Sequence, residues 1–389
     1  MSAAALAAAP AVPCDAPAIT PRAAGFHMPA EWEPQAGCWM AWPERTDTWR
    51  EGAKPAQAAF ATLANTIAGY EPVTMLVSQR QWANAARQLD AGQLDAGQLG
   101  AGVRVVEMST DDAWLRDTGA TFVIDGQGAL GGVDWRFNSW GGLDEGIYSP
   151  WDADDAVAAK MLEIERARRF RCDLVTEGGA LHVDGQGTVI TTEACLINPN
   201  RNPGLDRAAI ERLLGDYLGA ERVIWLGQGV PDDITGGHVD NLACFVAPGV
   251  VLLAWCDDPA DPHHAVSREA EARLLAARDA RGRPIRVERM PMPTPLYRTA
   301  EEADGTDRTN PRLIASAGDR LAASYVNFLI VNGAVIAPAF GVPTDDVARA
   351  ILQRLFPDRA IVMLPSREIL LGGGNIHCVT QQQPAARRG

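Results

Sequence analysis

The sequence lacks any hydrophobic run long enough to cross a membrane. Its 389 residues are 47% hydrophobic, but no stretch approaches the roughly 20 apolar residues that a spanning helix needs. Residues 1–24 are rich in Ala and Pro and lack the basic start and compact apolar core of a signal peptide. We therefore expect a cytoplasmic protein without a membrane partner, with a disordered lead-in at 1–24 and a loose tail at 385–389.

Paired cysteines and positive charge are also scarce. The seven cysteines are scattered, and no two of them form a C-x-x-C pair. This pattern argues against a disulfide framework or a structural zinc site, and it fits a reducing compartment. Lys and Arg number 35 against 49 Asp and Glu, for a net charge of −14. Such a surface repels nucleic acid and anionic membranes, so no nucleic-acid partner is expected.

What the sequence does contain is a repeated pattern. Four segments each show a hydrophobic run, a turn pair of Asp-Gly, Pro-Gly or Asn-Gly, and a second hydrophobic run, at 121–130, 180–191, 243–255 and 327–339. Such turn pairs between apolar runs predict β-hairpins. A short polar stretch precedes each hairpin, and a fifth one at 372–380, which is rich in Gly, has no return strand after it. We expect it to pair with the apolar strand at 37–43, which would close a ring without an open edge.

Helices separate the predicted hairpins. Apolar residues recur at helical spacing in five segments, 54–70, 151–167, 205–219, 267–282 and 344–356. Isolated strands are predicted near them at 72–78, 222–227 and 360–365. Each unit therefore combines a hairpin, a helix and a strand. Five such units in a ring predict a single α/β catalytic domain over 25–384.

Titratable residues recur where the predicted hairpins begin. Asp117, Glu177 and His238 precede three of them at nearly even spacing, and the fifth polar stretch contributes Cys378. Asp240 lies two residues after His238, so on a strand both would face the same side. In a closed ring these five side chains, although far apart in the sequence, would converge on the axis.

Residue types in this set point to guanidinium chemistry. Two carboxylates can each accept two hydrogen bonds from a planar guanidinium. A cysteine becomes a strong nucleophile once a neighbouring cation lowers its pKa, and a histidine beside a carboxylate moves protons near neutral pH. The set suits covalent attack on the central carbon of a small-molecule guanidino substrate. His377 adjoins Cys378 and would point to the opposite face of a strand, so we expect only one of them to enter the site.

Longer stretches carry a resemblance to a known family. They include "GFHMPAEWEPQAGCWMAWPERTDTWR", "DDAWLRDTGATFV", "LVTEGGALHVDGQGT", "GGHVDNLACF" and "EILLGGGNIHCVTQQQP", spread over nearly all of 25–384. Together they resemble the agmatine deiminases of the guanidine-modifying, peptidylarginine deiminase-like superfamily. The resemblance implies a five-bladed pseudo-symmetric α/β propeller and a homo-oligomer, in the form of a dimer. It also implies hydrolysis of agmatine to N-carbamoylputrescine and ammonia in putrescine biosynthesis, with no metal or other cofactor.

The resemblance also implies roles for the converging residues. Cys378 would be the nucleophile that forms a covalent thiouronium intermediate, and His238 the general acid and base. Asp117 and Asp240 would hold the guanidinium, and Glu177 would orient His238 or a guanidinium nitrogen.

Further residues would complete the substrate site. Trp114 would wall the pocket, and Gly374 would let the backbone approach the substrate closely. Asn327, which begins the fourth predicted hairpin, would also line the pocket.

Two stretches, "DDITGGH" and "GGVDWRFNSW", depart from the pattern of the family. Ile234 stands where the family carries an acid, Gly236 follows in place of Asn or Asp, and Arg136 replaces a glycine. The absence of the acid at position 234 and the presence of a base at position 136 favour a substrate with an anionic or neutral tail, such as guanidinobutyrate or a free or peptidyl arginine. The alternative is neutral drift, with Asp232 or Asp233 serving instead and Arg136 pointing away, which leaves agmatine as the substrate.

Two further classes of function remain open. In a metal-dependent hydrolase, Glu177, His238, Asp240 and Cys378 would be metal ligands and a chelator would abolish activity. Hydrolytic metal sites usually offer two or three histidines, and this set has one. In a non-catalytic propeller that binds guanidinium ligands, Cys378→Ala would change only packing.

Overall fold

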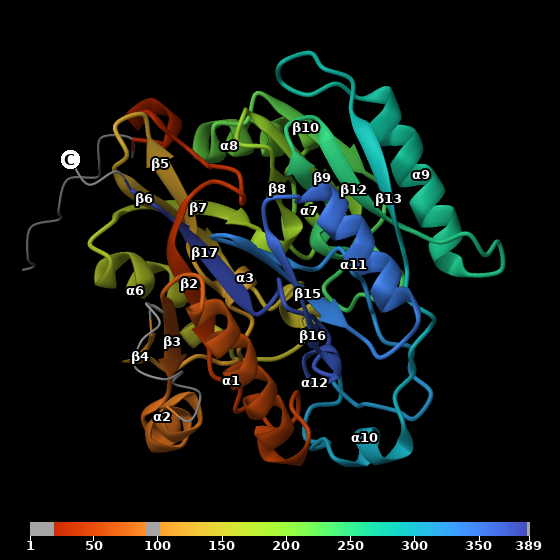
Figure 1. Ribbon diagram of the computed structural model, residues 1–389. Helices are drawn as coiled ribbons and strands as arrows, with labels where there is room; N and C mark the ends of the chain where they lie inside the picture. The colour runs from red at the N-terminus through yellow and green to blue at the C-terminus, as the bar shows by residue number, and fades with distance from the viewer. Residues whose placement is uncertain (1–18, 91–101, 387–389) are drawn as a thin grey trace, which may run out of the picture.

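The computed structural model describes residues 19–90 and 102–386 (Figure 1). No helix within these residues is long and apolar enough to cross a bilayer. Parts of the predicted lead-in and tail, residues 1–18 and 387–389, lie outside the described residues. Within the predicted lead-in, Arg22–Ala24 form the short 3₁₀ helix η1, and beyond residue 384 the Ala385 N–H donates to the Pro34 carbonyl at 2.8 Å. The described fold therefore extends slightly past both ends of the predicted domain.

Five separate sheets make up the molecule. Their strand orders are β1-β5-β6-β7, β8-β9-β10, β11-β12-β13, β14-β15-β16 and β17-β2-β3-β4. The strands span β1 Phe26–His27, β2 Gln35–Ala41, β3 Val73–Val77, β4 Val103–Glu107, β5 Thr121–Asp125, β6 Leu130–Arg136, β7 Arg168–Val175, β8 His182–Val183, β9 Thr188–Thr192, β10 Arg222–Leu226, β11 Ala243–Ala247, β12 Val250–Trp255, β13 Arg286–Pro291, β14 Leu329–Val331, β15 Ala334–Ala339, β16 Ala360–Pro365 and β17 Thr380–Pro384.

Helices connect the strands and cover the outside. The α-helices span α1 Lys54–Ala68, α2 Trp82–Asp90, α3 Leu115–Thr118, α4 Gly142–Glu145, α5 Asp152–Asp155, α6 Val157–Ile164, α7 Glu193–Leu196, α8 Arg207–Leu218, α9 Pro262–Ala276, α10 Ala300–Asp304, α11 Thr344–Leu355 and α12 Arg367–Leu370. The remaining 3₁₀ helices are η2 Glu51–Ala53, η3 Gln79–Gln81, η4 Gly178–Ala180 and η5 Val239–Asn241.

The repeated unit is an antiparallel hairpin followed by a helix and a parallel strand. All four predicted hairpins are confirmed, as β5–β6, β8–β9, β11–β12 and β14–β15. In the last of them Val331 pairs with Ala334, so Asn332 and Gly333 form a two-residue turn, and Gly333 has the positive φ of 79° that such a turn requires. The second strand of each hairpin then pairs in parallel with the next strand, β7, β10, β13 or β16.

The predicted helices are present, with two changes. The segment at 151–167 is divided into α5 and α6 at Ala156. The predicted helix at 267–282 is displaced, because α9 begins at Pro262 and ends at Ala276. Asp261 caps its start by accepting the His263 N–H, and Pro262 suits the first helical position. The strands β4, β7 and β13 carry many exposed charged residues, which is why their sequences showed no apolar pattern.

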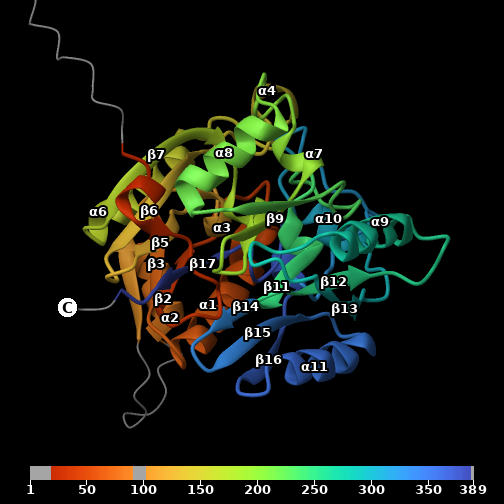
Figure 2. The same ribbon diagram turned by 90° about the horizontal axis from the view of Figure 1, so that it is seen from above.

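The fifth sheet joins two distant parts of the chain. As predicted, the strand after the fifth polar stretch pairs with the strand near residue 40, with Thr380 opposite Met40. Seen from above, the five sheets surround a common centre (Figure 2), and the fold is a five-bladed pseudo-symmetric α/β propeller. However, β17 begins only at Thr380, so Cys378 lies in the turn that precedes the strand and not on the strand itself.

The longer helices pack on the sheets through apolar faces, as α1, α6, α8 and α11 show. On α1, Phe60, Leu63 and Ile67 are almost fully buried against the core that includes β2 and β3. They lie three and four residues apart, so they share one side of the helix. Burying each such side chain contributes about 1.5–3 kcal/mol relative to exposure. These contacts hold the polar turns at the centre in place.

Candidate active site

Five polar turns, one from each unit, meet at the centre of the ring. They are α3, η4, η5, the segment 324–328 and the turn 374–379. Neighbouring turns bond to one another: the Arg116 N–H donates to the Cys378 carbonyl at 3.2 Å, and the His377 N–H donates to Asn327 Oδ1 at 3.0 Å. The 3₁₀ helix η4 packs against both α3 and η5. Side chains that are far apart in the sequence are therefore brought together here.

Gly179 marks the point where three predicted site residues converge. A Cβ atom added to Gly179 would lie 2.6 Å from His238 Nδ1, 2.9 Å from Asp117 Oδ1 and 3.0 Å from Asp240 Oδ2. Real Cβ atoms do not approach other atoms this closely, so only glycine fits. His238 and Asp240 reach this point from a 3₁₀ turn, because η5 begins at Val239. The expectation that they share a strand face was wrong, although their convergence is confirmed.

Glu177 holds His238 from one side and a buried arginine from the other. Glu177 Oε2 lies 3.1 Å from His238 Nε2, and Glu177 Oε1 accepts a hydrogen bond from Arg201 Nε at 3.0 Å. Burial alone would raise the pKa of Glu177, but Arg201 and His238 lower it to about 2. Burial alone would lower the pKa of His238, but its anionic neighbours, Asp117 first among them, raise it well above its usual value. The pair is therefore a fixed carboxylate beside an imidazolium.

Asp117 is held by two donors. Trp140 Nε1 donates to Asp117 Oδ2 at 2.9 Å, and the Gly179 N–H donates to Asp117 Oδ1 at 3.1 Å. Burial raises the pKa of Asp117 to about 6, and the nearby Asp240 and Glu177 add to the effect while His238 opposes it. Asp117 is therefore an anion at neutral pH that protonates in mild acid.

Cys378 lies against an aspartate and an amide. Its Sγ is 3.6 Å from Asp240 Oδ2 and accepts a hydrogen bond from Asn327 Nδ2 at 3.2 Å. Burial raises the pKa of the thiol well above its usual value, and Asp240 and Asp117 raise it further. The thiol is thus neutral in the empty site. Asp240 Oδ1 is buried and has no hydrogen-bond partner among the described residues, so it is free to accept a donor from a ligand.

His377 contacts the same aspartate as Cys378. His377 Nδ1 lies 2.9 Å from Asp240 Oδ2, and His377 Nε2 lies 2.9 Å from Glu31 Oε1. Only Cys378 of the adjacent pair lines the small inner chamber described below, so the expectation that just one of them enters the pocket is confirmed, although both residues lie in a turn and not on a strand. Two carboxylates require both ring nitrogens to be donors, which makes His377 an imidazolium. It balances the charge of Asp240, whose pKa falls below its usual value although burial opposes this.

Trp114 and Gly374 form part of a small inner chamber beside these groups. Asp117 and Cys378 also reach its wall, whereas His238 and Asp240 do not. Trp114 stacks on Trp49 with ring centroids 5.0 Å apart. A Cβ atom on Gly374 would lie 2.5 Å from the Trp114 ring and 3.1 Å from Cys378 Sγ, so glycine is required here. The chamber has a volume of about 20 Å³, roughly the space of one water molecule. It must widen to admit a guanidinium.

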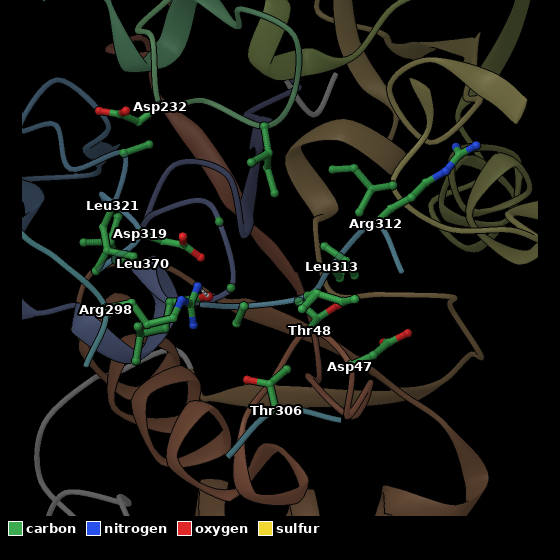
Figure 3. Close-up of a pocket in the computed structure, with 18 of the residues that line it drawn as sticks. Asp47, Thr48, Asp232, Arg298, Thr306, Arg312, Leu313, Asp319, Leu321 and Leu370 are labelled. Atoms are coloured by element: carbon green, nitrogen blue, oxygen red, sulfur yellow. Dashed lines mark hydrogen bonds between the residues drawn. The ribbon is translucent and has the colours of Figure 1, made fainter. Parts of the chain in front are cut away.

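The chamber borders an outer vestibule of about 720 Å³, whose lining residues are drawn in Figure 3. We define the throat as the residues that line both cavities, which are Thr48, Ile147, Ile234, Leu313, Gly372 and Gly373. Ile234 covers the backbone at its mouth: a Cβ on Gly373 would lie 2.6 Å from Ile234 Cδ1. The predicted place of Ile234 near the substrate tail thus agrees with the lining of the cavity.

Arg136 does not line the site. It is the last residue of β6, its side chain is 59% exposed, and its Nε lies 3.4 Å from the exposed carboxylate of Asp173. The expectation that it faces the pocket was wrong because the end of β6 points this side chain outward. The arginines that do line the vestibule, Arg298, Arg312 and Arg320, come from a long connection between β13 and β14.

Sequence reasoning missed three residues that support the site. Arg201 fixes Glu177, Trp140 fixes Asp117, and Asp112 accepts hydrogen bonds from Trp114, Trp49 and Thr48. Arg201 and Asp112 lie within the strings "NPNRNP" and "DDAWLRD", but no spacing rule connects them with their partners. Trp140 was only one of eleven tryptophans in the sequence.

The potential metal-ligand atoms that lie closest together do not form a favourable site for a metal ion. Glu177, Cys195 and His238 place one ligand atom each within 4.8 Å of one another. This is not the predicted set, which included Asp240 and Cys378. The Arg201 guanidinium also lies against Glu177 and is fully buried, so a metal ion would face a permanent positive charge. Such a charge disfavours a divalent cation.

Comparison with known proteins gives a consistent result. Residues 27–384 match the family of Porphyromonas-type peptidyl-arginine deiminases. The chain is similar to an agmatine deiminase of Pseudomonas aeruginosa (strain LESB58), with 58% identity over 373 residues, covering 96% of this chain and 99% of that protein. An agmatine deiminase of Pseudomonas putida is 58% identical over 367 residues, covering 94% and 97%. The solved agmatine deiminase of Enterococcus faecalis has 46% identity and a TM-score of 0.89, covering 94% of this chain and 98% of that one.

Proposed function

The chain belongs to the Porphyromonas-type peptidyl-arginine deiminase family, and from this premise we propose that it is a hydrolase that deiminates agmatine. The reaction converts agmatine and water to N-carbamoylputrescine and ammonia. The relatives named above support agmatine as the substrate, since their similarity extends over nearly the whole chain. The single observation that carries the mechanism is the convergence of Asp117, His238 and Asp240 on Gly179, with Cys378 against Asp240.

In the proposed mechanism, two carboxylates hold the substrate. The guanidinium lies between Asp117 and Asp240, and Asp240 Oδ1 accepts one of its N–H groups. Planar, charge-assisted hydrogen bonds of this kind fix both position and orientation. The positive charge of the substrate offsets the two carboxylates that keep the Cys378 thiol neutral. The thiol then loses its proton to solvent and becomes a nucleophile.

The first half of the reaction breaks a C–N bond. The Cys378 thiolate attacks the central guanidinium carbon and forms a C–S bond. His238, held by Glu177, donates its proton to one amino group, which leaves as ammonia. The product of this step is a cationic thiouronium covalently bound to Cys378.

The second half of the reaction uses water. His238, now neutral, takes one proton from a water molecule, whose oxygen attacks the thiouronium carbon. The C–S bond breaks, the sulfur takes the second proton, and the ureido product leaves. The enzyme returns to a neutral thiol and a protonated His238.

The test is ammonia release from agmatine together with mass spectrometry of acid-quenched enzyme. The proposal expects turnover and a covalent adduct on the peptide that contains Cys378. An adduct on another residue, or turnover that a chelator abolishes, would contradict the cysteine mechanism. Lack of turnover with any guanidine would contradict deimination itself.

We also propose a cytoplasmic location and a dimer. The six cysteines among the described residues, which omit Cys14, are all free thiols, and this supports a reducing compartment. The resemblance to the family supports self-association. Fractionation of cells and sedimentation of the purified protein test the two proposals separately.

A further inference from the structure

The throat offers no charged group to the tail of a bound guanidine. Its six residues are two glycines, one threonine and the apolar Ile147, Ile234 and Leu313. The only acids in the chamber wall are Asp117, which belongs to the guanidinium site, and Asp112. Asp112 already accepts four hydrogen bonds, from the backbone of Ala113 and from three side chains, which is its full capacity. The charge of a tail is therefore recognised beyond the throat.

Most acids of the vestibule already have partners. Asp47 and Asp232 form ion pairs with arginines, and Glu145 accepts a hydrogen bond from an asparagine. Asp319 accepts a backbone N–H at 2.7 Å. Asp144, on the short helix α4 at the rim, has no hydrogen bond or ion pair within the described residues. Asp144 and Asp319 are thus the acids left to attract a cationic tail.

Among the vestibule arginines, Arg298 stands out. Its Nη2 donates to the Leu371 carbonyl at 2.8 Å, one residue from the throat. Its Nε is buried without a hydrogen-bond partner, and no carboxylate lies within 4.0 Å of the guanidinium among the described residues. Burial lowers the pKa of Arg298, although Asp319 opposes this. Figure 3 shows the side chain beside Asp319, Leu321 and Leu370.

The backbone fixes Arg298 in this position. Its N–H donates to the Asp319 carbonyl at 2.9 Å, and its own carbonyl accepts the Gly318 N–H at 2.8 Å. The neighbouring Tyr297 forms a β-bridge with Arg320. A guanidinium held this way has little freedom to lose when it binds a ligand.

We propose that Arg298 is the ligand for a carboxylate on the substrate tail, so that the same catalytic centre also deiminates ω-guanidino carboxylates such as 4-guanidinobutyrate. This inference rests on the proposed deiminase function. The Nε–H of Arg298 has no partner among the described residues, and a guanidinium can bind a carboxylate through two parallel N–H groups on one edge. The uncharged throat suits the methylene chain between the two ends, and Ile234 packs at its mouth.

The experiment compares kcat/KM for three substrates that differ only at the tail: 4-guanidinobutyrate, agmatine and the neutral 1-butylguanidine. The proposal expects 4-guanidinobutyrate to exceed 1-butylguanidine. It also expects Arg298→Gln, which keeps an N–H donor for Leu371 but has no charge, to lower that ratio by about 10- to 100-fold. Arg136→Ala is the matched control, because this exposed arginine pairs with Asp173 outside the site. It should leave all three values unchanged.

Every other result either overturns the inference or contradicts the proposed function. If agmatine is turned over but 4-guanidinobutyrate is no better than 1-butylguanidine, the inference is overturned and the proposed function stands. If Arg298→Gln lowers all three values equally, Arg298 only anchors the Leu371 segment, and the inference is again overturned. If Asp319→Asn or Asp144→Asn removes a preference for agmatine over 1-butylguanidine while Arg298→Gln leaves the ratios unchanged, the vestibule recognises a cationic tail instead. If no guanidine is turned over, the proposed function itself fails.

Discussion

The charged groups around the inner chamber are buried, and each is held by hydrogen bonds or ion pairs to its neighbours. The vestibule, on the outer side of the throat, presents charges that are partly exposed. The turns of the repeated units supply the catalytic groups: Asp117 and Cys378 line the chamber, and Glu177, His238 and Asp240 adjoin them without lining it. The vestibule is built by segments between or beside those units, such as 142–147, 232–235 and 298–322. The repeat thus provides the chemistry at the guanidinium, and the irregular connections select what is attached to it. Substrate preference can change in such a molecule without change at the reacting atoms.

The largest effect is expected when the nucleophile of the chamber is removed. Cys378→Ser should lower kcat by more than about a thousandfold, because loss of a nucleophile removes the covalent route. Calorimetric titration should still detect agmatine binding, since both aspartates remain. Cys172→Ala is the matched control, because it removes a buried thiol from β7, outside the chamber. Full activity of Cys378→Ser would contradict the covalent mechanism.

A smaller effect is expected when the packing of the catalytic groups around Gly179 is disturbed. Gly179→Ala should lower kcat/KM by about 100-fold, because the new methyl group displaces His238, Asp117 or Asp240 and misplaced groups lose their alignment. Gly126→Ala is the control: it lies in a hairpin turn and a Cβ there meets no atom within 4 Å. Steady-state kinetics with agmatine measures both. Equal activity of the two variants would show that the convergence on Gly179 does not matter to catalysis.

The pH dependence of activity should report the protonation of the buried carboxylate of Asp117. The pKa of Asp117 is raised to about 6, so Asp117 gains a proton below that pH and loses its hold on the guanidinium. We expect kcat/KM to fall about fivefold from pH 6 to pH 5. The bound cation lowers this pKa, so kcat should begin to fall at a lower pH than kcat/KM. Trp140→Phe removes a donor that lowers the pKa of Asp117, so it should move the acid limb to higher pH. An acid limb that does not move would exclude Asp117 as its source.

The smallest expected effect concerns the throat. Ile234→Glu places a carboxylate at its mouth and should raise the kcat/KM ratio of agmatine to 1-butylguanidine by about two- to fivefold, because partly exposed charge pairs are weak. Ile314→Glu is the matched control, since Ile314 is 48% exposed and Ile234 is 49% exposed, and Ile314 lines the vestibule but not the throat. An equal change in both variants would mean that the throat has no special role.

The same division explains what could be predicted from the sequence. Turn pairs between apolar runs indicated four hairpins, and the titratable residues before them indicated the chamber, because both depend on local patterns that repeat. The strand placement of His238 and Asp240 was wrong because both lie in a turn, and a turn follows no alternation of faces. Arg136 was singled out because it departs from the family pattern, but nothing in the local pattern says which side of a sheet end a side chain faces. Arg298 lies in a long connection without periodicity, so only the folded structure brings it to Leu371.

The pairing of β2 with β17 has a kinetic consequence. It joins Met40 to Thr380, and contacts between such distant positions form late in folding because a long loop must close first. Apart from the two-residue strand β1, which pairs with the distant β5, the other four sheets can form from segments near one another, but the turn that carries Cys378 waits for this pairing. During refolding, secondary structure should therefore return before enzymatic activity. Conversely, local opening of this one sheet is enough to displace the nucleophile while the other four remain intact.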